Sequence, residues 1–114
     1  MLEYVLIYYK VLMCCWGGDM FNQICNLVKQ GALILDVRSQ KEYREGHNPR
    51  SLNIPIEKVA FELSRLPRER AIIVCCASGW RSHKAAQILK RYGIKNVYNA
   101  CSWQNTICTK VEAC

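Results

Sequence analysis

Two continuous apolar runs constrain this chain more than any other feature. Residues 32–37 (ALILDV) and 71–76 (AIIVCC) each stand beside a segment whose apolar residues recur at helical spacing. A run that is apolar at consecutive positions is typical of a parallel strand, because helices cover both of its faces. Strands that alternate with helices predict an α/β fold: a parallel sheet flanked by helices on both faces.

The first half of the chain supplies helix signals around the first run. A helix is expected from an N-cap at Asp19 to a stop at Gly31. Ser39 followed by Glu42 is a capping box and predicts a short helix after the strand. A brief strand is expected around residues 52–54.

The second half repeats the pattern. Residues 56–66 have helical spacing and end at a proline. A helix is expected from about residue 81 to 92, closed by Gly93, and a last short strand at 96–99. In such sheets ligands lie at the carboxyl ends of the strands, where the second apolar run ends.

The chain of 114 residues has room for one domain, and 51% hydrophobic residues are enough for a core. We divide it into an apolar extension at 1–18, expected to be helical with a first strand as the alternative, and a folded domain at 19–114. The extension is shorter than the roughly 20 residues of a membrane span and contains Glu3 and Lys10. We therefore expect it to pack on the domain or on a partner and not to anchor the chain in a membrane.

The net charge of +7 attracts anions in general. The basic residues do not form one block, so a solvated surface is favoured over a nucleic-acid site. They are spread over most of the chain: Lys41, Arg44, Arg50, Arg65, Arg68, Arg70, Lys84, Lys90, Arg91 and Lys95.

Eight cysteines are a high count for this length. A disulfide framework is not expected, because the sequence shows no secretory signal and four cysteines lie in adjacent pairs at 14–15 and 75–76. Zinc is not expected either, since there is no C-x-x-C pair and the two histidines lie far apart. The cysteines indicate a reduced, cytoplasmic protein without a metal or other cofactor.

The segment from the second apolar run into the following helix carries the candidate chemistry. A helix N-terminus presents unpaired backbone N–H groups and a partial positive charge. A cysteine held there, as Cys76 would be, is stabilised as a thiolate. Gly79 allows a tight turn, and Arg81 adds a positive fork suited to an oxyanion. Together these residues predict a nucleophile beside an anion cradle.

Residues 76–82 (CASGWRS) resemble the active-site loop of rhodanese-type sulfurtransferases. Residues 35–38 (LDVR), 42–47 (EYREGH) and 93–99 (GIKNVYN) also match that family, in the same order along the chain. The resemblance implies an α/β fold and a reaction in which the loop cysteine takes sulfane sulfur from a donor such as thiosulfate. The sulfur then passes to cyanide, a thiol or a protein acceptor.

The resemblance assigns roles by position. Cys76 would carry the persulfide, and Arg81 would hold the anionic donor. Asp36 and Arg38 match a strand-end pair that organises the loop, although a salt bridge that only fixes the sheet end is an equal alternative. The signature that contains Glu42 and His47 is mostly architectural. The remaining cradle residues, expected to contact substrate, are Ala77, Ser78, Gly79, Trp80 and Ser82.

Some positions depart from the family pattern. Asn48 and Arg50 stand where an apolar residue and a glycine are usual, so the turn there is expected to be reshaped. Cys101 replaces a usual glycine after the last strand, and little of the usual closing helix follows Trp103. These departures bear on the rim of the site and on the choice of substrate.

Other functions remain open. Counted from Cys75, the loop reads C-x5-R-S, the spacing of cysteine-dependent phosphatases and arsenate reductases. Those enzymes usually have glycine three residues after the nucleophile; Ser78 is there, whereas Gly79 fits Cys76. Neighbouring strand residues face opposite ways, so Cys75 is expected in the core. A third alternative is a rhodanese-like module that binds a partner without catalysis.

The remaining cysteines have no assigned role. Each could relay sulfur or resolve a persulfide, but a small apolar side chain or an incidental thiol is favoured for each alone. They are Cys14, Cys15, Cys25, Cys101, Cys108 and Cys114.

Overall fold

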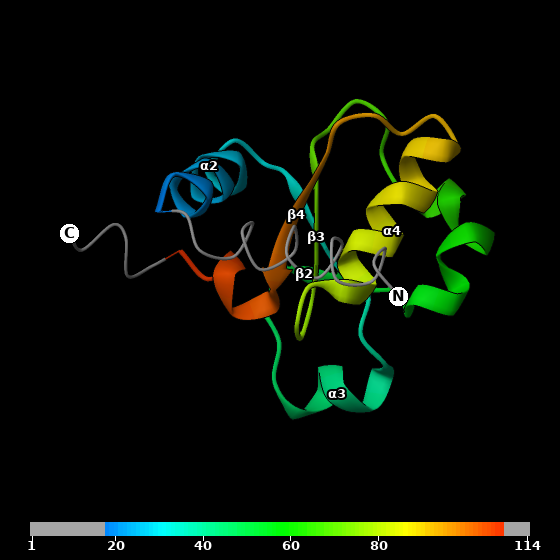
Figure 1. Ribbon diagram of the computed structural model, residues 1–114, viewed down its shortest axis with the longest axis horizontal. Helices are drawn as coiled ribbons and strands as arrows, with labels where there is room; N and C mark the ends of the chain where they lie inside the picture. The colour runs from blue at the N-terminus through cyan, green and yellow to red at the C-terminus, as the bar shows by residue number, and fades with distance from the viewer. Residues whose placement is uncertain (1–17, 109–114) are drawn as a thin grey trace, which may run out of the picture.

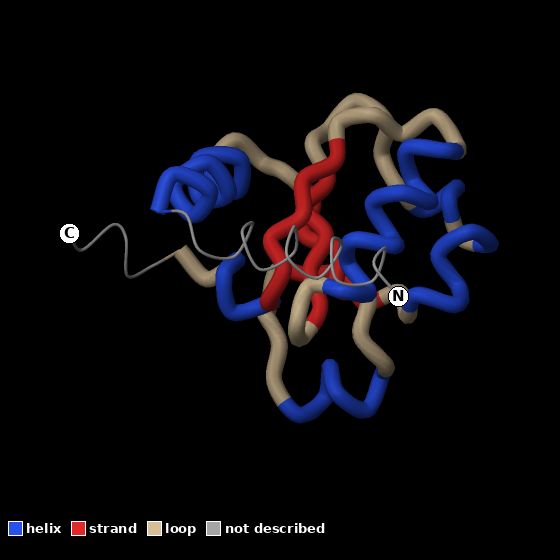
Figure 2. Tube along the Cα trace, viewed as in Figure 1, coloured by secondary structure: helices blue, strands red, loops and turns tan. Residues whose placement is uncertain are grey.

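Four parallel strands form the centre of the fold in the order β2-β1-β3-β4 (Figure 1). The computed structural model describes residues 18–108. The strands are β1 (Leu33–Asp36), β2 (Ser51–Asn53), β3 (Ile72–Cys76) and β4 (Val97–Ser102). Figure 2 shows the strands between two groups of helices, which confirms the predicted α/β architecture.

Within residues 18–108, three α-helices and three short 3-10 helices surround the sheet. The α-helices are α2 (Gly18–Lys29), α3 (Gln40–Glu45) and α4 (Trp80–Arg91). The 3-10 helices are η1 (Ile56–Phe61), η2 (Leu63–Arg65) and η3 (Trp103–Thr106). α4 and η1 lie on one side of the sheet, and α2 and η3 lie on the other.

Each face of the sheet has its own apolar core, because alternate residues of β3 point to opposite faces. Val74 and Cys76 pack with the helical side chains of α4, including Leu89. Ile73 and Cys75 pack on the opposite face against Ile24 of α2 and neighbouring apolar side chains. The two adjacent cysteines therefore lie on different faces, as the strand alternation predicts.

The capping box predicted at residues 39–42 is present. The Ser39 hydroxyl accepts a hydrogen bond from the Glu42 backbone N–H, and the Glu42 carboxylate accepts one from the Ser39 backbone N–H. This reciprocal pair satisfies donors that the start of a helix leaves unpaired. It fixes the point at which the chain turns from β1 into α3.

Two predicted helices differ from their expected form. α2 begins at Gly18, so Asp19 lies inside the helix and is not its N-cap. Residues 56–66 form the two 3-10 helices η1 and η2 and not one α-helix. The segment starts directly after Pro55 and closes with i→i+3 hydrogen bonds, such as the one from Lys58 N–H to the Pro55 carbonyl.

The last strand is longer than expected because it contains a bulge. Val74 pairs with Asn99, but Cys75 pairs with Cys101, so Ala100 is an extra residue in β4. Cys101 follows with a φ of 68°, in the left-handed region. The backbone there favours glycine, which is the residue usual at this position in the family that the sequence resembles.

The turn at Asn48 is held by the side chain of this residue. The buried Asn48 side chain donates two hydrogen bonds to Thr106, to the carbonyl and to the hydroxyl. Its own oxygen accepts from the Arg50 backbone N–H. The asparagine thus ties this turn to η3.

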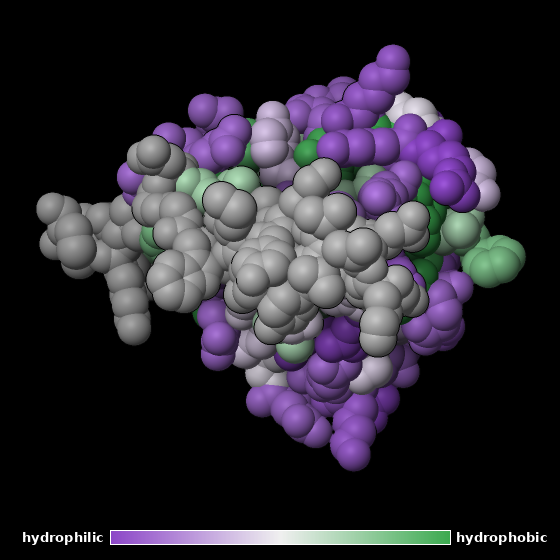
Figure 3. All heavy atoms as spheres, in the orientation of Figure 1, coloured by the Kyte–Doolittle hydropathy of each residue, from purple (hydrophilic) through white to green (hydrophobic). Residues whose placement is uncertain are grey.

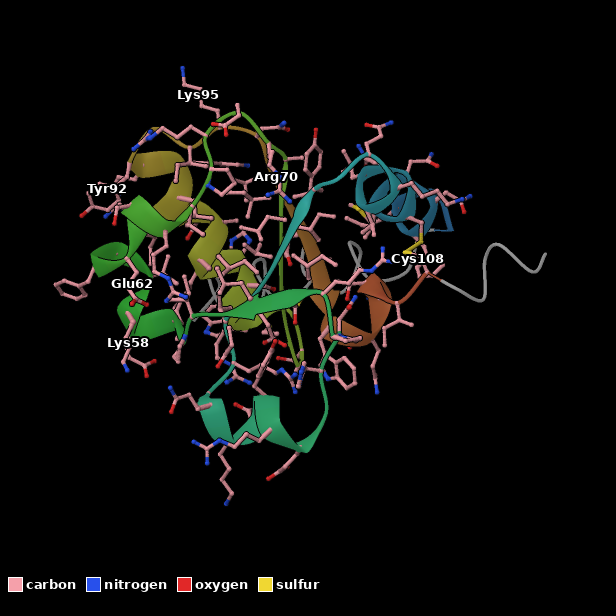
Figure 4. The ribbon with its side chains drawn as sticks, turned by 180° about the vertical axis from the view of Figure 1, so that it is seen from behind. Lys58, Glu62, Arg70, Tyr92, Lys95 and Cys108 are labelled. Carbon is pink, nitrogen blue, oxygen red and sulfur yellow. A yellow bond between two sulfur atoms is a disulfide. The ribbon has the colours of Figure 1, made fainter. Side chains whose placement is uncertain are left out.

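A disulfide joins Cys25 of α2 to Cys108, which follows η3, across a sequence separation of 83 residues. In Figure 4 it lies beside α2, next to the label of Cys108. The expectation of a fully reduced protein is wrong for this pair. Sequence spacing could not reveal it, because the two residues meet only through the packing of α2 against η3. The predicted helix of the N-terminal extension and Cys14, Cys15 and Cys114 lie outside the described residues.

Candidate active site

Cys76 ends β3, and its sulfur lies at the N-terminus of α4. The Sγ accepts hydrogen bonds from the backbone N–H of Gly79 at 2.9 Å and from that of Ser82 at 3.4 Å. Gly79 adopts a φ of 99°, which turns its N–H back toward the sulfur. The predicted arrangement of loop and helix start around Cys76 is therefore present.

A hydroxyl completes the surroundings of the sulfur. The Ser82 Oγ lies 3.4 Å from the Cys76 Sγ and also reaches the Gly79 carbonyl at 3.1 Å and the Asn99 Oδ1 at 2.6 Å. The hydroxyl has one proton, so it can turn from these oxygens to the sulfur when the sulfur carries negative charge. Ser82 and Cys76 are both fully buried.

Asn99 was not singled out from the sequence. Its Oδ1 accepts from the Ser82 hydroxyl and from the Cys101 backbone N–H at 2.8 Å. The side chain thus links the sulfur's surroundings to the bulge in β4. Asn99 could be recognised as part of the site only from the pairing of β4 with β3, which places it beside Val74.

Arg81 forms an ion pair with Glu42 of α3. Its two terminal nitrogens donate to the two carboxylate oxygens at 2.6 and 2.9 Å. These hydrogen bonds lower the pKa of Glu42 from 4.5 to about 2 and raise the pKa of Arg81. The guanidinium that was expected to hold a substrate anion is engaged by a carboxylate of the protein itself.

Asp36 and Arg38 form a second, buried ion pair. The Arg38 side chain donates to both oxygens of Asp36, at 3.0 to 3.1 Å from Nε and at 2.8 Å from Nη2. It also donates to the Gly46 carbonyl at 2.7 Å and lies over the ring of Trp103. These contacts fix the end of β1 to α3, which favours the salt-bridge role that was one of the two alternatives.

The neighbouring Cys75 is a poor nucleophile. It is fully buried in the core beneath α2. Burial raises the pKa of the Cys75 thiol far above its usual range, and the nearby charge of Asp36 raises it further. A phosphatase that uses Cys75 would require this thiol to ionise, so the geometry argues against that alternative.

The other predicted site residues lie around the loop. Ala77 and Ser78 are exposed, and Trp80 is half-buried at the start of α4 with the Lys84 ammonium over its ring. His47 stacks on Tyr43, and its Nδ1 is 2.6 Å from the Tyr43 carbonyl. His47 therefore stabilises the segment after α3, in line with an architectural role.

Three further features concern the described part of the molecule as a whole: the polarity of its surface, metal-binding groups and membrane-spanning helices. Figure 3 shows hydrophilic residues over much of the surface that is drawn in colour. Among residues 18–108, no three His, Cys, Asp or Glu side chains gather to hold a metal ion. In the same part of the chain no helix is long and apolar enough to cross a membrane.

Residues 20–100 match the model of the rhodanese-like domain family. The chain belongs to the rhodanese-like family. The match includes the loop at Cys76, both ion pairs and Asn99, so the geometry described above lies inside this rhodanese-like domain.

Several curated relatives of the rhodanese-like domain are named sulfurtransferases, and others are named tRNA uridine(34) hydroxylases. It is 30% identical over 70 residues to a sulfurtransferase of Allochromatium vinosum, covering 61% of this chain and 65% of that relative. It is 31% identical over 86 residues to the thiosulfate sulfurtransferase GlpE of Coxiella burnetii, covering 70% and 80%. The chain spans less than two thirds of the length of several curated relatives.

A solved structure supports the fold. The human single-domain sulfurtransferase TSTD1 superposes with a TM-score of 0.68 at 23% identity, covering 77% of this chain and 92% of that one. This likeness confirms the rhodanese-like architecture.

Proposed function

We propose that this rhodanese-like protein is a sulfurtransferase that carries sulfane sulfur as a persulfide on Cys76. The observation that carries the proposal is the position of the Cys76 sulfur among the N–H groups of Gly79 and Ser82 at the start of α4. Such donors favour a thiolate, which is the nucleophile that sulfur transfer needs.

The proposed reaction has two steps. The Cys76 thiolate attacks the outer sulfur of thiosulfate; a sulfur–sulfur bond forms to Cys76, the bond to the sulfonate sulfur breaks, and sulfite leaves with the electron pair. Cyanide or a thiolate then attacks the outer sulfur of the persulfide and leaves with it, which returns the Cys76 thiolate. A protein thiol can take the place of the small acceptor.

The cradle residues have distinct parts in this proposal. The N–H groups at Gly79 and Ser82 stabilise negative charge on the sulfur. The Ser82 hydroxyl accepts from the Cys76 thiol and donates to Asn99, and it can turn its proton to the sulfur once the thiol has ionised. The exposed Ala77 and Ser78 form the outer wall of the cradle. Because Cys76 is fully buried, a donor reaches its sulfur only after a local movement uncovers it.

The location of the protein is a separate part of the proposal. We retain a cytoplasmic location as a prediction, although the Cys25–Cys108 disulfide argues for a less reducing environment. Trapping of thiols in intact cells, followed by mapping of these two residues, tests it. Recovery of the pair only as a disulfide would contradict a cytoplasmic location.

Exchange of each adjacent cysteine for serine tests the reaction. Cys76→Ser should abolish transfer from thiosulfate to cyanide, because a hydroxyl cannot carry the persulfide. Cys75→Ser is the matched control and should keep substantial activity, with a stability loss of about 1–3 kcal/mol from a hydroxyl in the core. Mass spectrometry of the wild type after thiosulfate should map one added sulfur atom to Cys76.

The opposite dependence would refute the proposal. Hydrolysis of an aryl phosphate that is lost in Cys75→Ser would favour the phosphatase alternative. Full sulfur transfer in Cys76→Ser would place the nucleophile elsewhere.

A further inference from the structure

Both side chains of the ion pair between Glu42 and Arg81 are held in place by the elements that carry them. Arg81 belongs to the first turn of α4, directly after the cradle loop. Glu42 is fixed by the capping box, where its Oε1 also accepts from the Ser39 backbone N–H at 3.2 Å and hydroxyl at 3.0 Å. Each side chain of the pair is only about a third exposed, at 32% for Arg81 and 35% for Glu42. The carboxylate is thus a built-in neighbour of the guanidinium and not a chance surface contact.

We propose that Glu42 determines the anion specificity of the Cys76 site by neutralising Arg81, so that the site discriminates against doubly charged sulfur donors relative to singly charged ones. This inference rests on the proposed sulfur transfer. Glu42 acts through Arg81 and is not itself expected to contact the reacting atoms.

The charges around the site support this inference. An arginine beside the loop would attract a dianion strongly if it stood alone, but the bidentate carboxylate offsets its charge. The second arginine of the region, Arg38, is offset in the same way by Asp36. Because both oxygens of Glu42 are held, by Arg81 and by the capping box, a donor binds beside the carboxylate, and the repulsion it meets there grows with its own negative charge.

Two donors that differ in charge separate this effect from others. Thiosulfate has two negative charges and releases sulfite when the Cys76 thiolate takes its outer sulfur. An alkyl thiosulfonate has one negative charge and releases an alkyl sulfinate in the same step. The bond formed to Cys76 and the bond broken are of the same kind in both cases, so a difference in binding reports on charge.

Glu42→Gln removes the charge and keeps the oxygen that serves the capping box. The KM for thiosulfate should fall by about tenfold and the KM for the thiosulfonate by about threefold, because the repulsion removed scales with donor charge. The kcat with cyanide as acceptor should change little. Glu45→Gln is the control, since it removes the same charge from an exposed position of the same helix and should leave both KM values unchanged.

Two outcomes of these KM measurements would overturn the inference. A KM for thiosulfate that is unchanged or raised in Glu42→Gln would overturn the inference, because Glu42 would then serve only to position Arg81. An equal change for both donors would also overturn it. If wild-type Cys76 takes up sulfur from neither donor, it is the proposed function that fails.

A binding measurement keeps the charge effect testable without turnover. Sulfate and methanesulfonate, which differ by one charge, are compared by the concentration that protects Cys76 from an uncharged alkylating agent. Methanesulfonate should protect the wild type at the lower concentration of the two, whereas sulfate should become the stronger ligand in Glu42→Gln. Sulfate that protects the wild type at the same concentration as methanesulfonate, or at a lower one, would refute the inference.

Discussion

The Cys25–Cys108 disulfide is expected to supply a large part of the stability of this domain. It closes a loop of 83 residues, which includes every strand of the sheet, and the two Cα atoms lie 5.5 Å apart. A cross-link of this kind acts mainly on the unfolded chain, which it prevents from exploring extended conformations.

The loop length sets the size of the effect. The chain-entropy relation gives about 4.5 kcal/mol for a loop of this length at 25 °C. Domains of this size are stable by roughly 5–15 kcal/mol in total. Reduction should therefore remove about a third or more of the free energy of unfolding. The folded state should persist, because Ile24 and the neighbouring side chains still anchor α2 to the sheet.

Urea denaturation with and without a reductant measures this loss. The wild type should unfold at a lower urea concentration when reduced, and with a larger slope, because the unfolded chain without a cross-link exposes more surface. The double variant Cys25→Ala/Cys108→Ala is the control. Its unfolding curve should be the same in both buffers and should lie near that of the reduced wild type.

Two results would refute this reasoning. The first is a wild-type midpoint that does not depend on the reductant. The second is a shift of the same size in the double variant, which would assign the effect to another cysteine.

The remaining predictions concern the ion pairs and the bulge. Arg38→Ala should cost about 3–5 kcal/mol in urea denaturation, because it leaves the buried carboxylate of Asp36 unpaired; a loss below about 1 kcal/mol would contradict this. Cys101→Gly should leave the free energy of unfolding within about 1 kcal/mol of the wild type, since relief of the positive φ offsets the lost side chain, whereas Cys101→Val should be clearly destabilising. The lowered pKa of Glu42 means that its pair with Arg81 stabilises the fold above pH 4.5 and that this contribution is lost as the pH falls to about 2. Because the pair is partly exposed, the loss should be only about 1 kcal/mol, and it should be missing from Glu42→Gln in denaturation curves taken across that range.

The fold could be predicted from the sequence where the signal is local. The apolar runs became β1 and β3, and the capping box at Ser39 lies at the start of α3. The 3-10 form of residues 56–66 could not be predicted, because the same apolar spacing fits an α-helix until the tertiary contacts are known. The bulge at Ala100 depends on the pairing of β4 with β3 and has no local signature.

The Cys25–Cys108 disulfide could not be predicted from the sequence for a related reason. Adjacent cysteines and spacing rules describe cysteines that are close in sequence, whereas Cys25 and Cys108 are brought together by α2 and η3. Neither residue stands in a motif that distinguishes it from the other cysteines.

Glu42 shows most clearly what sequence reasoning could and could not reach at the candidate site. Its role in the capping box depends on Ser39, three residues away, and was predicted from that spacing. Its pairing with Arg81 spans 39 residues and exists only because α3 and the start of α4 meet at the same edge of the sheet. Local patterns therefore placed the cysteine, the glycine and the arginine in one loop. The carboxylate that pairs with this arginine could be found only from the fold.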